Sequence, residues 1–87
     1  MNIVIHRFRN SSDGEVRISN LIHKDKSYVD IRVYARLVPG RKFMPTGKGL
    51  IVDANFLPEL VRGFEKSLEK IVGAIDGSRS IARKANL

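Results

Sequence analysis

Hydrophobic and polar residues alternate without a break along residues 27–37, SYVDIRVYARL. The odd positions are all apolar: Val29, Ile31, Val33, Ala35 and Leu37. The even positions are charged or carry an aromatic hydroxyl: Tyr28, Asp30, Arg32, Tyr34 and Arg36. A period of two in a segment rich in β-branched and aromatic residues predicts a strand. We expect one face to pack on a core. The other face either contacts a ligand through its arginines and tyrosines or is a solvated surface in which Asp30 pairs with a neighbouring arginine.

The flanking segments predict three further strands. Residues 2–9 begin with a β-branched run, and residues 15–19 alternate again, with a turn at residues 10–14 between them. We interpret residues 20–26 as a polar connection. After a turn at Val38-Pro39-Gly40, residues 41–52 return as a fourth strand. Pro45 and Gly47 interrupt it, which predicts a bulge or an edge position.

The clearest helix follows the last strand. Asp53 or Asn55 is a candidate N-cap, Pro58 falls in the first turn, and Gly77 is a candidate C-terminal stop. Steps of three and four define one apolar stripe: Leu57, Leu60, Val61, Phe64, Leu68, Ile71, Val72 and Ile75. The expected length is about 22 residues, or roughly 33 Å. The predicted fold class is therefore α+β, a four-stranded antiparallel sheet followed by one long C-terminal helix.

A helix of this length extends beyond the width of a small sheet. Its C-terminal turns would leave apolar side chains uncovered, and exposed stripes of that size usually have a partner. We therefore predict a homodimer through the helices, with an interface of Phe64, Leu68, Ile71, Val72 and Ile75. Alternatively, the basic tail, residues 78–87, folds back over the stripe. In either case we predict that residues 1–77 form one domain and that residues 78–87 follow it as a basic tail.

Composition narrows the class of partner. The 87 residues include 16 Lys and Arg against 9 Asp and Glu, giving a net charge of +7 and a pI near 10.3. Such an excess favours nucleic acid or an anionic membrane surface, whereas ribosomal-type charge or plain solubility charge is the alternative. No cysteine is present, and no apolar run approaches the length of a membrane span. We expect a soluble intracellular protein with no membrane partner.

Catalytic and metal-binding patterns are absent from the sequence. His6 and His23 have no cysteine or patterned carboxylate nearby to complete a metal site. No nucleophile elbow occurs, and the glycine-rich Gly47-Lys48-Gly49 lacks the rest of a phosphate loop. We expect neither enzymatic activity nor a metal or cofactor.

Basic residues interleaved with aromatic residues on strands are the remaining candidate chemistry. Sheets that hold single strands neutralise phosphates with Lys and Arg and stack unpaired bases on rings. The candidate nucleic-acid-binding residues are Arg7, Arg9, Arg17, Lys24, Lys26, Arg32, Tyr34, Phe43 and Lys48. Phe43 is alternatively a core residue.

Three segments in this order resemble the positive-cofactor-four family of single-stranded-DNA-binding transcriptional coactivators, which has bacterial and phage relatives. They are Val29-Asp30-Ile31-Arg32-Val33-Tyr34, Phe43-Met44-Pro45-Thr46-Gly47-Lys48-Gly49-Leu50 and Leu57-Pro58-Glu59-Leu60. The resemblance covers roughly residues 3–75. It implies a curved sheet, a homodimer through the helices and channels for melted or single-stranded DNA. Family DNA-contacting residues match Arg7, Lys24, Lys26, Arg32 and Lys48.

Three positions depart from the family pattern. Family aromatic residues match Leu21 and Ala35, and a family lysine matches Met44. Stacking would then fall to Tyr34, Tyr28 or Phe43, or affinity would rest more on charge. The resemblance implies single-stranded DNA binding in transcription or in DNA replication, recombination or repair, with partner proteins of those processes. It also implies a cytoplasmic or nucleoid-associated location (host cytoplasm if phage-encoded). The alternatives are an RNA-binding or duplex-DNA-binding regulatory dimer and a protein-interaction adaptor.

Overall fold

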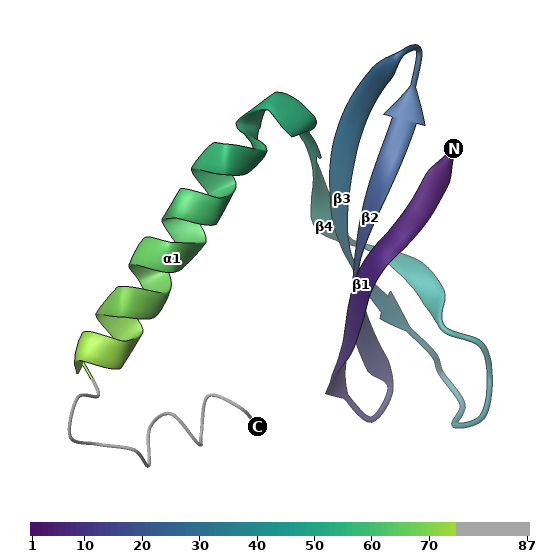
Figure 1. The fold of residues 1–87 in the computed structure, drawn as a ribbon. Coiled ribbons are helices and arrows are strands. Elements are labelled where there is room, and N and C mark those ends of the chain that lie inside the picture. The colour runs from purple at the N-terminus through teal and green to yellow at the C-terminus, as the bar shows by residue number, and fades with distance from the viewer. Residues whose placement is uncertain (75–87) are drawn as a thin grey trace. The chain divides into compact units, whose positions relative to one another are not determined.

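The computed structural model describes residues 1–74 of the chain. The chain divides into two units, residues 1–55 and a second unit that begins at Phe56. The first unit is a sheet and the second contains a helix (Figure 1). The predicted order of four strands followed by one helix is confirmed.

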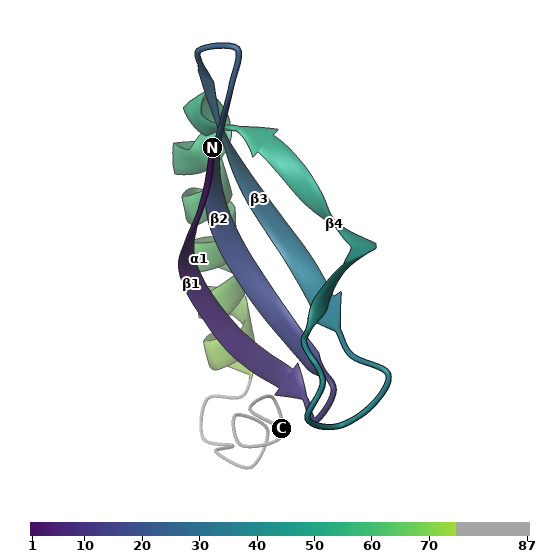
Figure 2. The same cartoon turned by 90° about the vertical axis from the view of Figure 1, so that its right-hand side faces the viewer.

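The sheet is an open antiparallel meander in which each strand pairs with the next one in the chain. It consists of β1 (Asn2–Ser11), β2 (Gly14–His23), β3 (Lys26–Ala35) and β4 (Met44–Asp53), in the order β1-β2-β3-β4. The strands twist and bend together along their length (Figure 2). β1 and β4 are therefore the two edges, and the proline-containing strand lies at an edge as predicted.

The prediction of a polar connection over residues 20–26 is wrong. β2 continues to His23 and β3 begins at Lys26, so Lys24 and Asp25 alone form the turn. Both adopt positive φ angles, 50° and 63°, as the two-residue turn of a tight hairpin requires. Lys-Asp is not one of the Asn-Gly or Asp-Gly pairs that signal this turn, so the pattern did not mark it.

Other strand ends also shift from their predicted positions. β1 extends two residues beyond the predicted residues 2–9, because Ser11 still pairs with Gly14 across a two-residue turn. β3 ends at Ala35, so Arg36 and Leu37 lie in the β3–β4 loop. β4 begins at Met44 rather than at residue 41. Phe43 therefore belongs to the loop and not to a strand.

The second unit contains the helix α1 (Leu57–Ala74), which follows a single 3₁₀ turn, η1 (Ala54–Phe56). The Asp53 side-chain oxygen Oδ1 accepts a hydrogen bond from the backbone N–H of Asn55 at 2.9 Å, so Asp53 caps this turn. Pro58 lies in the first turn of α1, as predicted. The expected stop at Gly77, the interface residue Ile75 and the tail over residues 78–87 lie outside the described residues.

The strand register sorts side chains onto two faces of the sheet. The apolar face carries cross-strand pairs such as Val16–Val33 and Ile18–Ile31. The charged face is the one that carries Arg17 opposite Arg32 and Ser19 opposite Asp30. Both assignments follow the predicted alternation of residues 27–35.

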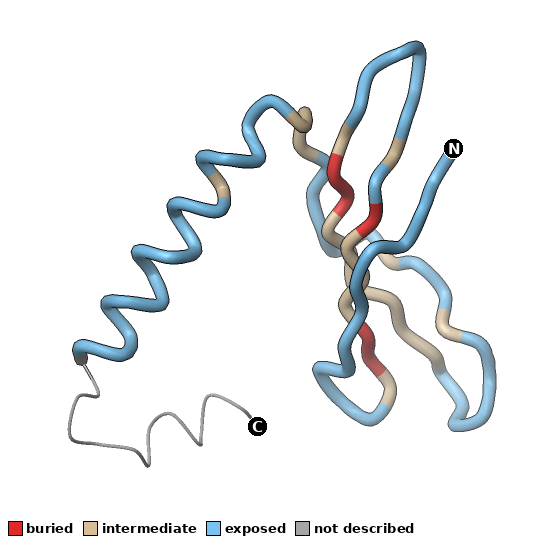
Figure 3. Tube along the Cα trace, viewed as in Figure 1, coloured by how far each residue is buried: buried red, intermediate tan, exposed pale blue. Residues whose placement is uncertain are grey.

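Burial within the sheet is greatest on its charged face. Within residues 1–74 Val29 is the one buried hydrophobic residue, whereas Glu15, Ser19 and Asp30 are all buried (Figure 3). The long side chains of Arg17 and Arg32 pair with Glu15 and Asp30, whereas no element of the sheet unit itself covers the apolar face. Phe8 and Leu50 on the apolar face are each 49% exposed. Within the sheet unit the apolar face is therefore left half-exposed.

Candidate nucleic-acid interface

Three arginines form one row across the charged face. Arg7 of β1 lies opposite Arg17 of β2, and Arg17 lies opposite Arg32 of β3. The row ends on β4 at Gly49, which has no side chain. Directly opposed residues in antiparallel strands have Cβ atoms about 4.5–5.5 Å apart, and like charges in such pairs are destabilising. A row of this kind favours a bound anion.

Two acids in the neighbouring rows partly offset this repulsion. Arg17 Nε donates to Glu15 Oε2 at 2.9 Å, and Arg32 Nη2 lies 3.1 Å from Asp30 Oδ1. These pairs are two residues apart on one strand, so both partners share the charged face. The interpretation in which Asp30 pairs with a neighbouring arginine therefore matches the structure. The four arginines Arg7, Arg9, Arg17 and Arg32 against Glu15 and Asp30 leave +4 − 2 = +2 in the centre of this face.

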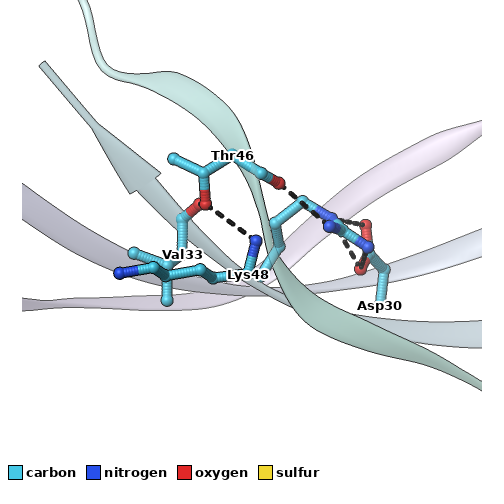
Figure 4. A network of polar contacts seen from close by, with 5 residues as sticks. Asp30, Val33, Thr46 and Lys48 are labelled. Atoms are coloured by element: carbon cyan, nitrogen blue, oxygen red, sulfur yellow. Dashed lines mark hydrogen bonds and ion pairs between the residues drawn. The ribbon is translucent and has the colours of Figure 1, made fainter.

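A bulge in β4 holds Arg32 from the other side. Figure 4 shows Thr46 of this bulge between Val33 and Lys48. Arg32 Nη1 donates to the Thr46 carbonyl oxygen at 3.0 Å, and Thr46 Oγ1 donates to the Val33 carbonyl oxygen at 2.7 Å. The backbone N–H of Lys48 donates to Thr46 Oγ1 at 3.1 Å. The register between β3 and β4 shifts here, between Arg32 and Tyr34. The interruption predicted near Pro45 and Gly47 is confirmed, and it places Lys48 within the bulge.

Guanidinium groups cover two of the three candidate stacking rings, Tyr34 and Phe43. The Arg17 guanidinium carbon lies 4.0 Å from the Tyr34 ring centroid. The guanidinium carbons of Arg9 and Arg36 each lie 4.6 Å from the Phe43 ring centroid. These distances are within cation–π range. Phe43 therefore contacts cations of the charged face, whereas Phe8, opposite Val16, lies on the apolar face.

Arg36 belongs to this site, although it was not among the predicted binding residues. Its Nε donates to Asp13 Oδ1 at 3.3 Å, and its Nη2 donates to the Ser12 carbonyl oxygen at 3.0 Å. Arg36 thus ties the end of β3 to the β1–β2 turn while lying over Phe43. The alternation of residues 27–37 already placed Arg36 on the arginine side, which was the available signal.

The remaining predicted cations lie elsewhere on the sheet. Lys24 and Lys26 are exposed at the β2–β3 turn, the end of the sheet opposite the β1–β2 turn and the β3–β4 loop. Arg7 is exposed on edge strand β1, and Arg9 Nη1 donates to the Ser12 carbonyl oxygen at 3.2 Å. Arg7, Arg9, Arg17, Arg32 and Tyr34 thus gather on one face, with Phe43 at one end and the two lysines at the other.

The three positions that depart from the family pattern lie on different faces of the sheet. Leu21 pairs with Tyr28 and lies on the charged face. Ala35 and Met44 pair with each other at the loop end of β3 and β4, on the apolar side of the register. Leu21 alone of the three therefore shares a face with the arginine row, from which the Ser19–Asp30 pair separates it.

Metal binding and membrane crossing find no support in the described part of the chain. Across residues 1–74 no group of three His, Asp or Glu side chains is placed to hold a metal ion. No helix in the same residues combines the length and apolar character needed to cross a membrane.

An open four-stranded antiparallel sheet followed by one C-terminal helix is a PC4-like (positive cofactor four) fold. The solved structures similar to this chain are PC4 homologs. One is BPSL1147 from Burkholderia pseudomallei, whose tetragonal crystal form matches with a TM-score of 0.69 and 24% identity over 77% of this chain and 97% of that one. Its orthorhombic form matches with a TM-score of 0.66 and 23% identity over 74% and 85% of the two chains.

A phage protein has the same architecture. It is the bacteriophage T5 homolog of the eukaryotic transcription coactivator PC4, implicated in recombination-dependent DNA replication, with a TM-score of 0.52 and 15% identity over 99% of this chain and 91% of that one. No protein-family model matches the chain, and no curated protein is similar enough in sequence to count as a match. The resemblance to the positive-cofactor-four family is thus confirmed at the level of the fold.

Proposed function

We propose that this protein is a homodimeric, largely sequence-independent single-stranded-DNA-binding protein that acts in transcription regulation or in DNA replication, recombination or repair. The observation that carries the proposal is the row Arg7–Arg17–Arg32 on a sheet face that also holds the ring of Tyr34 and reaches Phe43. The PC4 fold supports it, and the T5 homolog's reported link to replication indicates which processes to consider.

Phosphate is the anion that suits this row. Guanidinium groups pair with phosphate oxygens through planar, paired donors and keep their charge at any physiological pH. Arg7 is exposed and has no ion pair within residues 1–74, so it is available to a phosphate without breaking a contact. Arg17 and Arg32 have donors left over after pairing with their acids, because each guanidinium carries five N–H groups.

Unpaired bases suit the rings and the planes that cover them. A base stacks on an aromatic ring or on an arginine plane, and each stacked base contributes about 1–3 kcal/mol without regard to sequence. In this chain Arg17 lies over Tyr34, and Arg9 and Arg36 lie over Phe43. A base therefore stacks in one of two ways. It lies on the guanidinium plane, or the guanidinium moves off the ring to bind a phosphate and the base then stacks on the ring itself.

Homodimer formation accounts for the apolar surface that a single chain leaves open. The α1 stripe is exposed, with Phe64 at 60% and Leu68 at 61%. The helix is amphipathic, because other positions of α1 carry charged residues such as Arg62 and Glu59, which form an exposed ion pair at 2.7 Å. Pairing of two α1 helices from two copies through Phe64, Leu68, Ile71, Val72 and Ile75 would bury this stripe.

Competition among oligonucleotides tests the function. We expect a fluorescent oligothymidine to bind and to be displaced by unlabelled single strands of any sequence far more readily than by duplex or RNA. The logarithm of affinity should fall with the logarithm of salt concentration by about 0.7 per phosphate contacted. A preferred duplex sequence at physiological salt would instead identify a duplex-binding regulator. Preference for RNA would identify an RNA-binding dimer, and affinity no tighter than about 10⁻⁴ M for any nucleic acid would identify an adaptor.

A further inference from the structure

A cleft of about 400 Å³ opens at the loop end of β3 and β4. Ala35 and Met44 of its floor pair with each other on the apolar side of the register, so this floor lies on the side of the sheet opposite the arginine row. The rest of its apolar lining comes from Leu37, Val38 and Pro45. The volume falls within the range of about 300–1,000 Å³ typical of ligand pockets. The cleft is therefore a candidate site separate from the charged face.

The sheet unit leaves the apolar side chains around the cleft uncovered. Leu37 is 100% exposed, Val38 54% and Met44 58%. Single exposed apolar side chains are ordinary on a protein surface, whereas several around one opening are typical of an interaction site. A ligand that covers these three side chains removes apolar surface from water, which favours its binding.

The charged side chains that line the cleft are all basic. They are Arg36, Arg41 and Lys42, and within residues 1–74 no Asp or Glu lines the cleft. Arg36 pairs with Asp13 at 3.3 Å. Arg41 and Lys42 are exposed and take part in no ion pair among the same residues. A concave surface lined by one sign of charge attracts a ligand of the opposite sign.

The loop that forms the cleft has a defined backbone. The N–H of Arg41 donates to the Val38 carbonyl oxygen at 3.1 Å, which closes a four-residue turn. Pro39 occupies the second position of this turn, and Gly40, with φ of +82°, occupies the third, the arrangement of a type II turn. A residue other than glycine is strained at that φ. The turn therefore fixes the backbone of Arg41 beside the apolar lining.

We propose that this cleft docks an acidic segment of a partner protein, with one large apolar side chain of that segment in the cleft and its carboxylates on Arg41 and Lys42. A carboxylate at these cations gains charge-assisted hydrogen bonds. A leucine or phenylalanine side chain is apolar on every edge and suits the lining of Leu37, Val38 and Met44. A nucleobase would leave polar edges unpaired against the same side chains. The proposal goes beyond the proposed function, because it assigns a protein partner to a surface outside the charged face.

Charge also distinguishes a partner from the chain's own C-terminal segment. Residues 75–87 contain Arg79, Arg83 and Lys84 against Asp76 alone. Like charges repel, so this segment matches the basic lining of the cleft poorly. An acidic segment of another protein has the complementary charge.

Fluorescence anisotropy with a synthetic acidic peptide tests the docking. The labelled probe alternates Asp with Ser and has one central Phe. A second peptide has Ala in place of the Phe, and a third has Asn in place of every Asp. We expect the probe to bind about tenfold more tightly than the Ala peptide, because a buried anchor residue carries much of the binding energy of an interface. The Asn peptide should also bind weakly, because it offers no charge to Arg41 and Lys42.

Substitution of Met44 tests the apolar floor. Met44→Gln has nearly the same shape but places an amide in the floor, so it should weaken binding of the probe about fivefold. The same substitution should leave binding of the Ala peptide unchanged. Met44→Leu keeps the floor apolar and should bind the probe like the wild type, and circular dichroism checks that the variants fold.

Substitution of the two free cations tests the charge contact. The double variant Arg41→Gln, Lys42→Gln should weaken binding of the probe about fivefold and reduce its dependence on salt. Lys66→Gln, Lys70→Gln removes the same charge from exposed positions of α1 and should leave binding of the probe close to that of the wild type.

Saturating oligothymidine separates the cleft from the charged face. The probe should stay bound, because the cleft floor and the arginine row lie on opposite sides of the sheet. Displacement of the probe by oligothymidine, together with full affinity of Met44→Gln for the probe, would place the peptide on the arginine row and overturn the docking site. Equal affinity for the probe and the Ala peptide would overturn it as well.

The docking site and the proposed function fail separately. A wild type that binds oligothymidine but not the probe overturns the docking site alone, including the case in which residues 75–87 or a second copy fills the cleft. A wild type that binds the probe but no single strand overturns the proposed function alone.

Discussion

Asp30 occupies the position where a phosphate on the arginine row would compete for the same cation. Its carboxylate is buried and accepts from Arg32 Nε at 3.1 and 3.3 Å through its two oxygens. A purely structural pair would stabilise the sheet and have no effect on a ligand. A pair within a binding site would restrain the arginine and lower its attraction for an anion. The two roles predict different behaviour when the charge of Asp30 is removed.

Asp30→Asn is expected to strengthen binding to single-stranded DNA about fivefold, because two charges 4 Å apart in water interact by about 1 kcal/mol. Fluorescence anisotropy with oligothymidine at low salt measures the change. Glu65→Gln on α1 makes the same change in net charge at an exposed position and should leave affinity nearly constant. Unchanged or weaker binding by Asp30→Asn would assign Arg32 a structural role only.

Gly49 is the residue on which the bulge in β4 depends. Its φ is +150°, and a Cβ built there would overlap the Ile31 carbonyl oxygen and lie 2.8 Å from the Arg32 Cα. Gly49→Ala should lower the free energy of unfolding by about 1–3 kcal/mol, measured by urea denaturation. Gly47→Ala, where a Cβ meets no atom within 4 Å, is the matched control and should change it by about 0.5 kcal/mol or less. Equal effects of the two substitutions would contradict the bulge geometry.

At the scale of elements, the sequence predicted the strands whose patterns are regular and missed the ends that depend on turns. The alternation over residues 27–37 identified β3 and the correct faces of Ile31 and Arg32. The sequence pattern did not identify the Lys24-Asp25 turn, because its positive φ angles come from pairing of the flanking strands and not from Asn or Gly. Pro45 marked the irregular part of β4 because a residue without an N–H disturbs any ladder.

The candidate site was predictable in part for the same reason. Alternation places Arg17 and Arg32 on one side of their strands, but which arginines share a row depends on the register between strands, which sequence pattern specifies weakly. The contact of Arg9 with Phe43 joins residues far apart in the chain, and the contact of Arg36 with Phe43 depends on how the β3–β4 loop folds back. No local pattern encodes such contacts.

The helix α1 carries the prediction of a dimer. Leu68→Asp places a charge in the apolar stripe. Ser67→Asp adds the same charge at the preceding position, which is also exposed. Sedimentation equilibrium should give about twice the chain mass of 9.8 kDa for the wild type and for Ser67→Asp, and the chain mass for Leu68→Asp. A wild type that sediments as a single chain at micromolar concentration would rule out the dimer.

At the scale of the whole molecule, charge and apolar surface are distributed unequally over the sheet. One face holds the arginine row with its buried acids, and the other holds half-exposed apolar side chains such as Phe8 and Leu50. The centre of the charged face carries a net charge of +2, which is part of the chain's net charge of +7. A polyanion and a second protein surface would then bind opposite faces without competing.

The assignment of single-stranded DNA to the charged face is tested most directly by NMR titration of the full chain with oligothymidine. The side-chain Nε–Hε signals of Arg7, Arg9, Arg17 and Arg32 should shift as DNA is added, while the Arg62 signal on α1 and the methyl signals of Ile18 and Ile31 on the apolar face stay in place. Shifts at Ile18 and Ile31 with unmoved arginine signals would contradict the proposed binding face.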